Sequence, residues 1–168
     1  MVLTKSELLD SLQNEVRILV HLAGKVDRAK LDYRPTAKQR STLELLKYLS
    51  MMGPALVEYT MAETPDLGVW TRAAEAAEQR DFDQTVAAIA AQTDTYTKLL
   101  ANVPESSFRS PITGFDGKET SKGAMLTSLV LGGCAAYRTQ LFCYLKACGR
   151  EELSTMNLWA GMDAPAPA

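Results

Sequence analysis

Apolar residues recur at helical spacing in four stretches of the chain, separated by turn-forming residues. In each stretch these positions share one face at about 100° per residue, so each predicted helix must bury that face against another helix. The four predicted helices are residues 5–26, a segment beginning at residue 41, residues 81–100 and residues 121–148. The pattern predicts an all-α fold built as an antiparallel four-helix bundle.

The predicted helix starts carry the polar pairs of capping boxes, in which two side chains satisfy free N–H groups of the first turn. These pairs are Thr4 with Glu7, Ser41 with Glu44 and Asp81 with Gln84. Pro54 lies inside the second pattern, where it should kink that helix or end it near Gly53. The longer connections leave room for a short helix around residues 72–79 and for a short hairpin within residues 102–120.

Length and composition fit one globular domain, predicted to span residues 1–162, followed by a disordered Ala/Pro-rich tail over residues 163–168. Of the 168 residues 46% are apolar, and the net charge is -2 without a Lys/Arg-rich run, which argues against nucleic acid as a partner. The polar N-terminus and the absence of a membrane-length apolar run predict a cytoplasmic protein. Cys134, Cys143 and Cys148 are interpreted as buried, unreactive thiols in a reducing compartment.

Four short motifs occur in a characteristic order: LDYRP at 31–35, STLELLKYL at 41–49, AYRTQL at 136–141 and NLW at 157–159. Together they resemble the DinB/YfiT-like family of four-helix proteins. The resemblance implies an up-up-down-down bundle with a long crossover connection, often as a homodimer. It also implies that many relatives hold a divalent metal through three histidines, and that some are transferases or isomerases that use bacterial thiols.

This sequence lacks the histidines at all three metal-ligand positions that the resemblance implies, which hold Tyr48, Gly133 and Tyr137. A phenol with a pKa near ~10 is a poor substitute for imidazole, and glycine offers no ligand. The single histidine, His21, is predicted on the surface, because it lies nearly opposite the apolar stripe of its helix. We therefore expect a DinB-like protein whose metal site is degenerate, with no metal and no cofactor.

The former ligand positions remain the candidate site: Tyr48, Gly133 and Tyr137 would line a ligand pocket, with Glu44, Arg138 and Gln140 as its possible support. The alternative is that the two phenol rings fill the space of the metal site, with Gly133 making room for one of them. Arg138 and Gln140 would then only brace the bundle.

Three functions remain open from the sequence, and it does not decide whether the protein is an enzyme. The first is a non-catalytic protein that binds a small apolar or amphipathic molecule, with Trp70 as a possible part of the pocket mouth. The second is a metal-independent, thiol-dependent transferase that uses Tyr48 or Tyr137. The third is a homodimeric interaction module whose dimer face would contain Ile18, Leu22 and Leu46.

Overall fold

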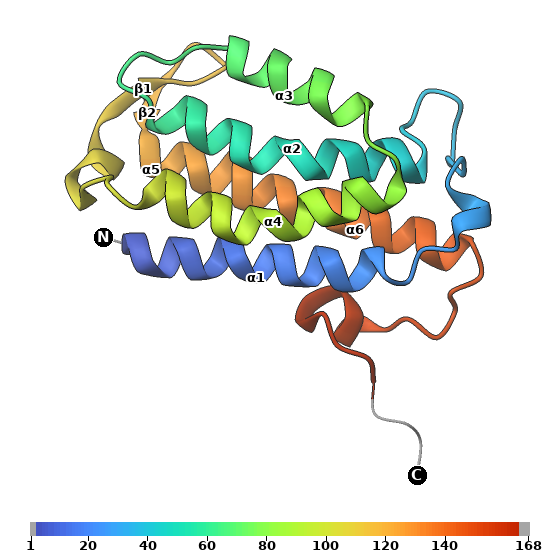
Figure 1. The fold of residues 1–168 in the computed structure, drawn as a ribbon. Coiled ribbons are helices and arrows are strands. Elements are labelled where there is room, and N and C mark those ends of the chain that lie inside the picture. Colours follow the sequence, from blue (N-terminus) through green and yellow to red (C-terminus); the bar gives the residue numbers. More distant parts are fainter. Residues whose placement is uncertain (1–2, 165–168) are drawn as a thin grey trace.

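The computed structural model, which describes residues 3–164, confirms an all-α bundle (Figure 1). The helices are α1 (Lys5–Ala23), α2 (Thr42–Met61), α3 (Gly68–Glu78), α4 (Phe82–Leu100), α5 (Lys122–Met125) and α6 (Gly132–Ala147). Shorter helical turns, named η1 to η4, span Arg28–Lys30, Glu105–Arg109, Leu126–Leu131 and Met156–Ala160. The predicted hairpin is present, with β1 (Pro111–Thr113) antiparallel to β2 (Glu119–Ser121).

The helix starts follow the capping signals of the sequence. All three capping boxes form, at the N-termini of α1, α2 and α4. The segments α5, η3 and α6 follow one another as a single rod, in which η3 is a wider π-helical turn. Just beyond α6, Gly149 has a φ of 99°, a left-handed conformation that glycine adopts without steric cost and that ends the helix.

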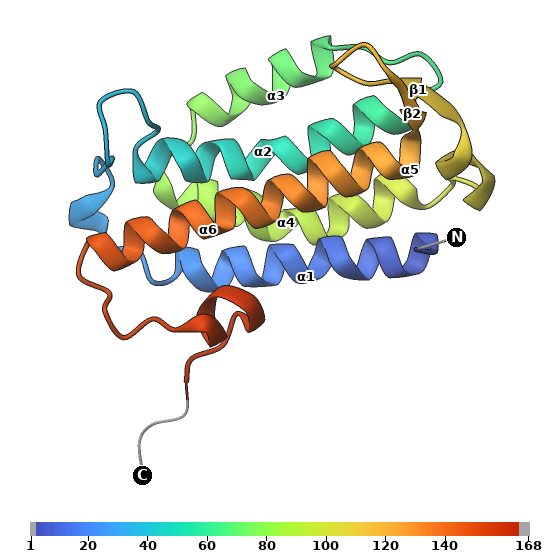
Figure 2. The same ribbon diagram turned by 180° about the vertical axis from the view of Figure 1, so that it is seen from behind.

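The helix directions differ from the up-up-down-down order that the family resemblance implies. Figures 1 and 2 show α1 and the α5–α6 rod running one way, while α2 and α4 run the other way. Hydrogen bonds agree, since Lys5 at the start of α1 donates to the carbonyl of Leu100 at the end of α4. The order is therefore up-down-down-up: the first connection reverses the chain, and the long crossover is the α2–α4 connection that contains α3.

Pro54 does not end α2, which continues to Met61. At this point α2 passes very close to α4: a Cβ atom added to Gly53 would lie 1.9 Å from the hydroxyl oxygen of the buried Tyr96. Tyr96 donates a hydrogen bond to Gln92, whose amide donates to the carbonyl of Leu49 on α2. Packing between these two parallel helices therefore keeps the second half of α2 helical.

The predicted dimer face is wrong, because Ile18, Leu22 and Leu46 are all 0% exposed within the single chain. The sequence analysis assigned too few positions of α1 and α2 to the buried face. Helix α1 packs against α4 on one side, against α6 on another, and also against the C-terminal turn η4. The three residues belong to one of the two core clusters, so they stabilise the bundle and are not available for a second copy.

The C-terminal segment packs onto α1 and covers the residue that was expected on the open surface. The His21 side chain is only 17% exposed, and its Nε2 atom lies 3.0 Å from Asn157 Nδ2. Asp163, predicted to begin the disordered tail, accepts hydrogen bonds from Asn157 and Lys25. The remainder of that predicted tail, residues 165–168, lies outside the described residues. Among residues 3–164, no helix combines the length and apolar character needed to cross a membrane.

Candidate functional site

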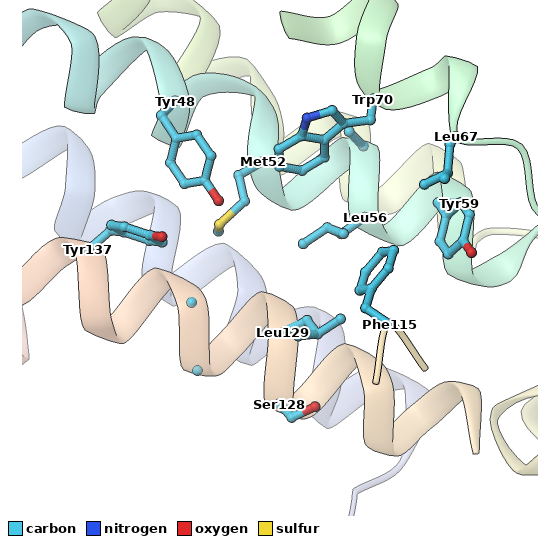
Figure 3. Close-up of a pocket in the computed structure, with 13 residues that line it drawn as sticks. Tyr48, Met52, Leu56, Tyr59, Leu67, Trp70, Phe115, Ser128, Leu129 and Tyr137 are labelled. Carbon is cyan, nitrogen blue, oxygen red and sulfur yellow. The ribbon is translucent and has the colours of Figure 1, made fainter. Parts of the chain in front are cut away.

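A pocket of about 550 Å³ lies between α2 and the η3–α6 part of the rod, below α3 and the hairpin. Its walls include Met52 and Leu56 from α2, Trp70 from α3 and Leu129 from η3 (Figure 3). None of the side chains that line it is charged. The volume and the apolar, aromatic lining are typical of sites for small molecules.

The three positions singled out by the family resemblance converge at one end of this pocket, since Tyr48, Gly133 and Tyr137 all line it. The rings of Tyr48 and Tyr137 meet edge to face with centroids 4.8 Å apart, and Trp70 packs against Tyr48 at 5.9 Å. Figure 3 shows both phenol oxygens turned toward the pocket interior. The rings thus form the end wall of the pocket and do not fill its whole volume.

Burial of Tyr48, together with the adjacent Tyr137 phenol, raises the pKa of Tyr48 to about 12. Burial disfavours the charged phenolate. The Tyr48 side chain, neutral at pH 7 like any phenol, therefore stays a protonated hydrogen-bond donor to a higher pH than an exposed tyrosine.

Gly133 makes room for a methionine and not for either tyrosine ring, contrary to the interpretation from the sequence. A Cβ atom at this position would lie 3.2 Å from the sulfur of Met52 and 3.3 Å from its terminal methyl carbon. Because the Met52 side chain is flexible, it adapts to the bare glycine backbone where α2 approaches α6. The glycine thus lines the pocket where Met52 packs against α6.

The opposite end of the pocket is formed by residues that the sequence did not single out. Phe115, in the hairpin turn, is 60% exposed and stacks on Tyr59 of α2 with ring centroids 5.7 Å apart. Leu67, which precedes α3, lines the same end and is 59% exposed. The sequence did contain a signal for Phe115: it is an aromatic residue between two glycines, at 114–117, where turn residues are normally polar.

The three proposed support residues do not line this pocket. Arg138 is 3% exposed and pairs with Glu15 on α1, with 3.0 Å between Nη1 and Oε1. Gln140 donates to the hydroxyl of Tyr144, and Glu44 completes the cap of α2 while pairing with Arg34. In the structure, Arg138 and Gln140 brace the bundle, and Glu44 stabilises the start of α2.

The thiols differ from one another in a way that the sequence interpretation missed. Cys134 is buried, and burial raises the pKa of its thiol to about 12, so this residue is unreactive. Cys143 is exposed, contrary to the interpretation that all three thiols are buried, because it lies on the outer face of α6. Within residues 3–164, no group of three or more His, Cys, Asp or Glu side chains is arranged to hold a metal ion.

No protein-family model and no curated protein matches this sequence. Among solved structures, the chain is similar to a DinB-like protein from Bacillus subtilis, with a TM-score of 0.65 and 17% sequence identity. The alignment covers 88% of this chain and 94% of the other. At this identity the similarity concerns the fold alone, and this chain has a DinB-like fold.

Proposed function

We propose that this protein binds a small apolar or amphipathic molecule in the pocket between α2 and the η3–α6 rod. The observation that carries the proposal is the uncharged pocket of about 550 Å³, lined at one end by the phenols of Tyr48 and Tyr137. A pocket of this size and lining buries most of the surface of a small ligand, and that burial is the main favourable contribution to affinity.

The pocket combines apolar walls with a few polar groups at a defined end. The Tyr48 phenol, which is neutral at pH 7, donates a hydrogen bond to an oxygen acceptor on a ligand. At the other end, exposed Phe115 and Leu67 offer apolar surface to an entering molecule. This arrangement suits an elongated ligand with its polar end at the tyrosines.

Titration with the fluorescent apolar probe 1-N-phenylnaphthylamine tests the proposal. We expect saturable binding of one probe per chain. Leu129→Trp should abolish it, because Leu129 projects into the pocket and a larger ring there occupies the ligand volume. Leu131→Trp is the matched control, since Leu131 is also half-buried in η3 but does not line the pocket.

Thermal melting must first show that both variants are folded. Probe binding that is non-saturable in the native protein, or equally strong in folded Leu129→Trp, would remove the proposal. Loss of binding in Leu129→Trp together with retention in Leu131→Trp supports it.

A further inference from the structure

A second, polar pocket of about 300 Å³ adjoins the phenol end of the ligand pocket. The two pockets share Tyr48 and Trp70 as walls. The polar pocket also contains the charged side chains of Arg40, Glu44, Lys47 and Glu78. The phenol end of the apolar pocket therefore borders a charged environment at Tyr48 and Trp70.

Two cations and two carboxylates line this polar pocket, but they do not form two pairs with one another. Lys47 pairs with Glu78 at 3.6 Å, and Glu44 pairs with Arg34 at 3.2 Å. Within the part of the chain that the structure describes, neither ion pair includes Arg40, and no carboxylate lies within 4.0 Å of its guanidinium group. Because Glu44 pairs with Arg34, which does not line the pocket, Arg40 is the one cation of the described lining without a carboxylate partner.

Arg40 is held next to the two tyrosines. Its guanidinium carbon lies 4.0 Å from the centroid of the Tyr48 ring and 5.9 Å from that of Tyr137. Its backbone is fixed as well, because the hydroxyl of Tyr144 donates to the Arg40 carbonyl at 3.0 Å, and Gln140 donates to that hydroxyl. Stacking on an aromatic face leaves the edge of a guanidinium group, with its N–H donors, free for a ligand.

From this juxtaposition we propose that the ligand class is an amphipathic monocarboxylate. Its apolar chain lies along the uncharged pocket, and its carboxylate group passes the Tyr48 ring to meet Arg40. The inference rests on the proposed function and adds the chemistry of the polar end. A guanidinium fork matches the two oxygens of a carboxylate, and one unpaired guanidinium group matches a monoanion. A cationic head group would be repelled at the same place.

A matched set of ten-carbon probes tests the head group: decanoate, 1-decanol and decyltrimethylammonium, each used below its micelle concentration. Their affinities are measured by displacement of 1-N-phenylnaphthylamine at pH 7.5. We expect decanoate to bind roughly tenfold more tightly than decanol, because a charge-assisted hydrogen bond replaces a neutral one. Decyltrimethylammonium should bind more weakly than decanol. The preference for decanoate should fall as the salt concentration rises.

Arg40→Gln should remove the preference for decanoate while leaving the affinity for decanol within about twofold. Lys38→Gln is the control, since Lys38 is an exposed residue of the same loop, carries the same charge and lines neither pocket. If Lys38→Gln removes the preference equally, the effect is one of net charge and the role assigned to Arg40 is wrong.

Failure of this inference is distinguishable from failure of the proposed function. If decanol binds in the pocket but decanoate binds no better, or if Arg40→Gln keeps the preference, the carboxylate inference is overturned and the binding function stands. If no probe of the set, including 1-N-phenylnaphthylamine, binds saturably, both are overturned.

Discussion

The phenol rings of Tyr48 and Tyr137 meet edge to face at 4.8 Å, although the two residues lie 89 positions apart in the sequence. They join α2 to α6 at the level where Gly133 lets Met52 approach the rod. Edge-to-face aromatic pairs contribute about 0.5–1.5 kcal/mol beyond the burial of their surface. The contact therefore stabilises the bundle and lines one end of the pocket at the same time.

Alkaline titration should show that the Tyr48 phenol is protonated far above its ordinary range. Its pKa is raised from 10.0 to about 12, so between these pH values the folded state binds a proton that the unfolded state has lost. The free energy of unfolding is therefore unaffected by this group below pH 10, and it falls as the pH rises from 10 toward 12.

Tyr48→Phe tests this expectation by ultraviolet difference titration of tyrosinate at 295 nm. The variant should lose one tyrosine that titrates near 12, and its stability should fall less steeply above pH 10. Tyr96, whose pKa burial also raises well above 10.0, remains in both proteins and serves as the internal comparison. A variant that loses a tyrosine titrating near 10 would contradict the burial of Tyr48 at the pocket wall.

Gly53→Ala should destabilise the protein by about 1–3 kcal/mol, as is usual for overpacking a dense core. The added methyl group would meet the hydroxyl oxygen of Tyr96 at 1.9 Å and its ring carbon at 3.2 Å. Urea denaturation measures the change. In a Tyr96→Phe background the hydroxyl is absent, so the same substitution should cost clearly less.

Gly132→Ala is the matched control, because it also replaces a helical glycine by alanine. The nearest atom to its new Cβ would be the Thr127 carbonyl oxygen at 3.7 Å, an ordinary contact. We expect a gain of about 0.5–1 kcal/mol from the better helix propensity of alanine. Equal effects of Gly53→Ala and Gly132→Ala would show that the close contact between α2 and α4 is not present in solution.

The sequence was sufficient for the features that depend on local patterns. Capping boxes located three helix starts, and the order of short motifs identified the fold and placed Tyr48, Gly133 and Tyr137 together. Contacts between distant segments were not predictable in this way. Phe115 reaches the pocket only because the hairpin folds over α2, and His21 is covered only because the C-terminal turn returns to α1.

The role of Arg40 was missed for a related reason. Its significance depends on which neighbouring charges are already paired, and the pairing of Glu44 with Arg34 and of Lys47 with Glu78 is a property of the folded chain. Likewise, Arg138 looked like a pocket residue beside Tyr137, but adjacent positions on a helix point about 100° apart. Arg138 therefore faces α1, where it meets Glu15.

Removing only one member of the buried ion pair between Glu15 and Arg138 should lower the stability of the protein strongly. Arg138→Met leaves the Glu15 carboxylate, 14% exposed, without its cation, and we expect a loss of about 3–5 kcal/mol in the free energy of unfolding. The double variant Glu15→Leu with Arg138→Met removes both charges and should recover most of this loss. Urea denaturation at pH 7 measures all three proteins.

The exposed pair of Arg28 and Asp83 provides the comparison, because both side chains are more than 60% exposed, at 65% and 68%. Arg28→Met should change the stability far less than Arg138→Met, because water and salt screen an exposed ion pair. If Arg138→Met has an equally small effect, Glu15 is solvated or protonated in the folded protein, and the pair does not brace α6 against α1.

Acidification should release the C-terminal turn η4 from α1, because a neutral His21 holds it. The Asn157 side chain accepts a hydrogen bond from the Ser154 amide through Oδ1, so its Nδ2 group faces His21 Nε2 and donates to it. Burial, and then the charge of Lys25, lower the pKa of His21 below 6.5, with Asp163 opposing the shift. A lowered folded-state pKa means that this contribution is fully present above pH 6.5 and is lost as the pH falls through the folded-state value.

Fluorescence of Trp159 in η4 reports this release, provided that Trp70, the only other tryptophan of the chain, is replaced by phenylalanine. In the docked turn, the guanidinium carbon of Arg138 lies 5.5 Å from the centroid of the Trp159 ring. We expect the emission to change as the pH is lowered from 7.5 to 5, since Trp159 then leaves this position. His21→Gln keeps a polar side chain without the titration and should flatten the profile. An unchanged profile in His21→Gln would assign the transition to another group, and no transition in either protein would mean that η4 stays docked when His21 is charged.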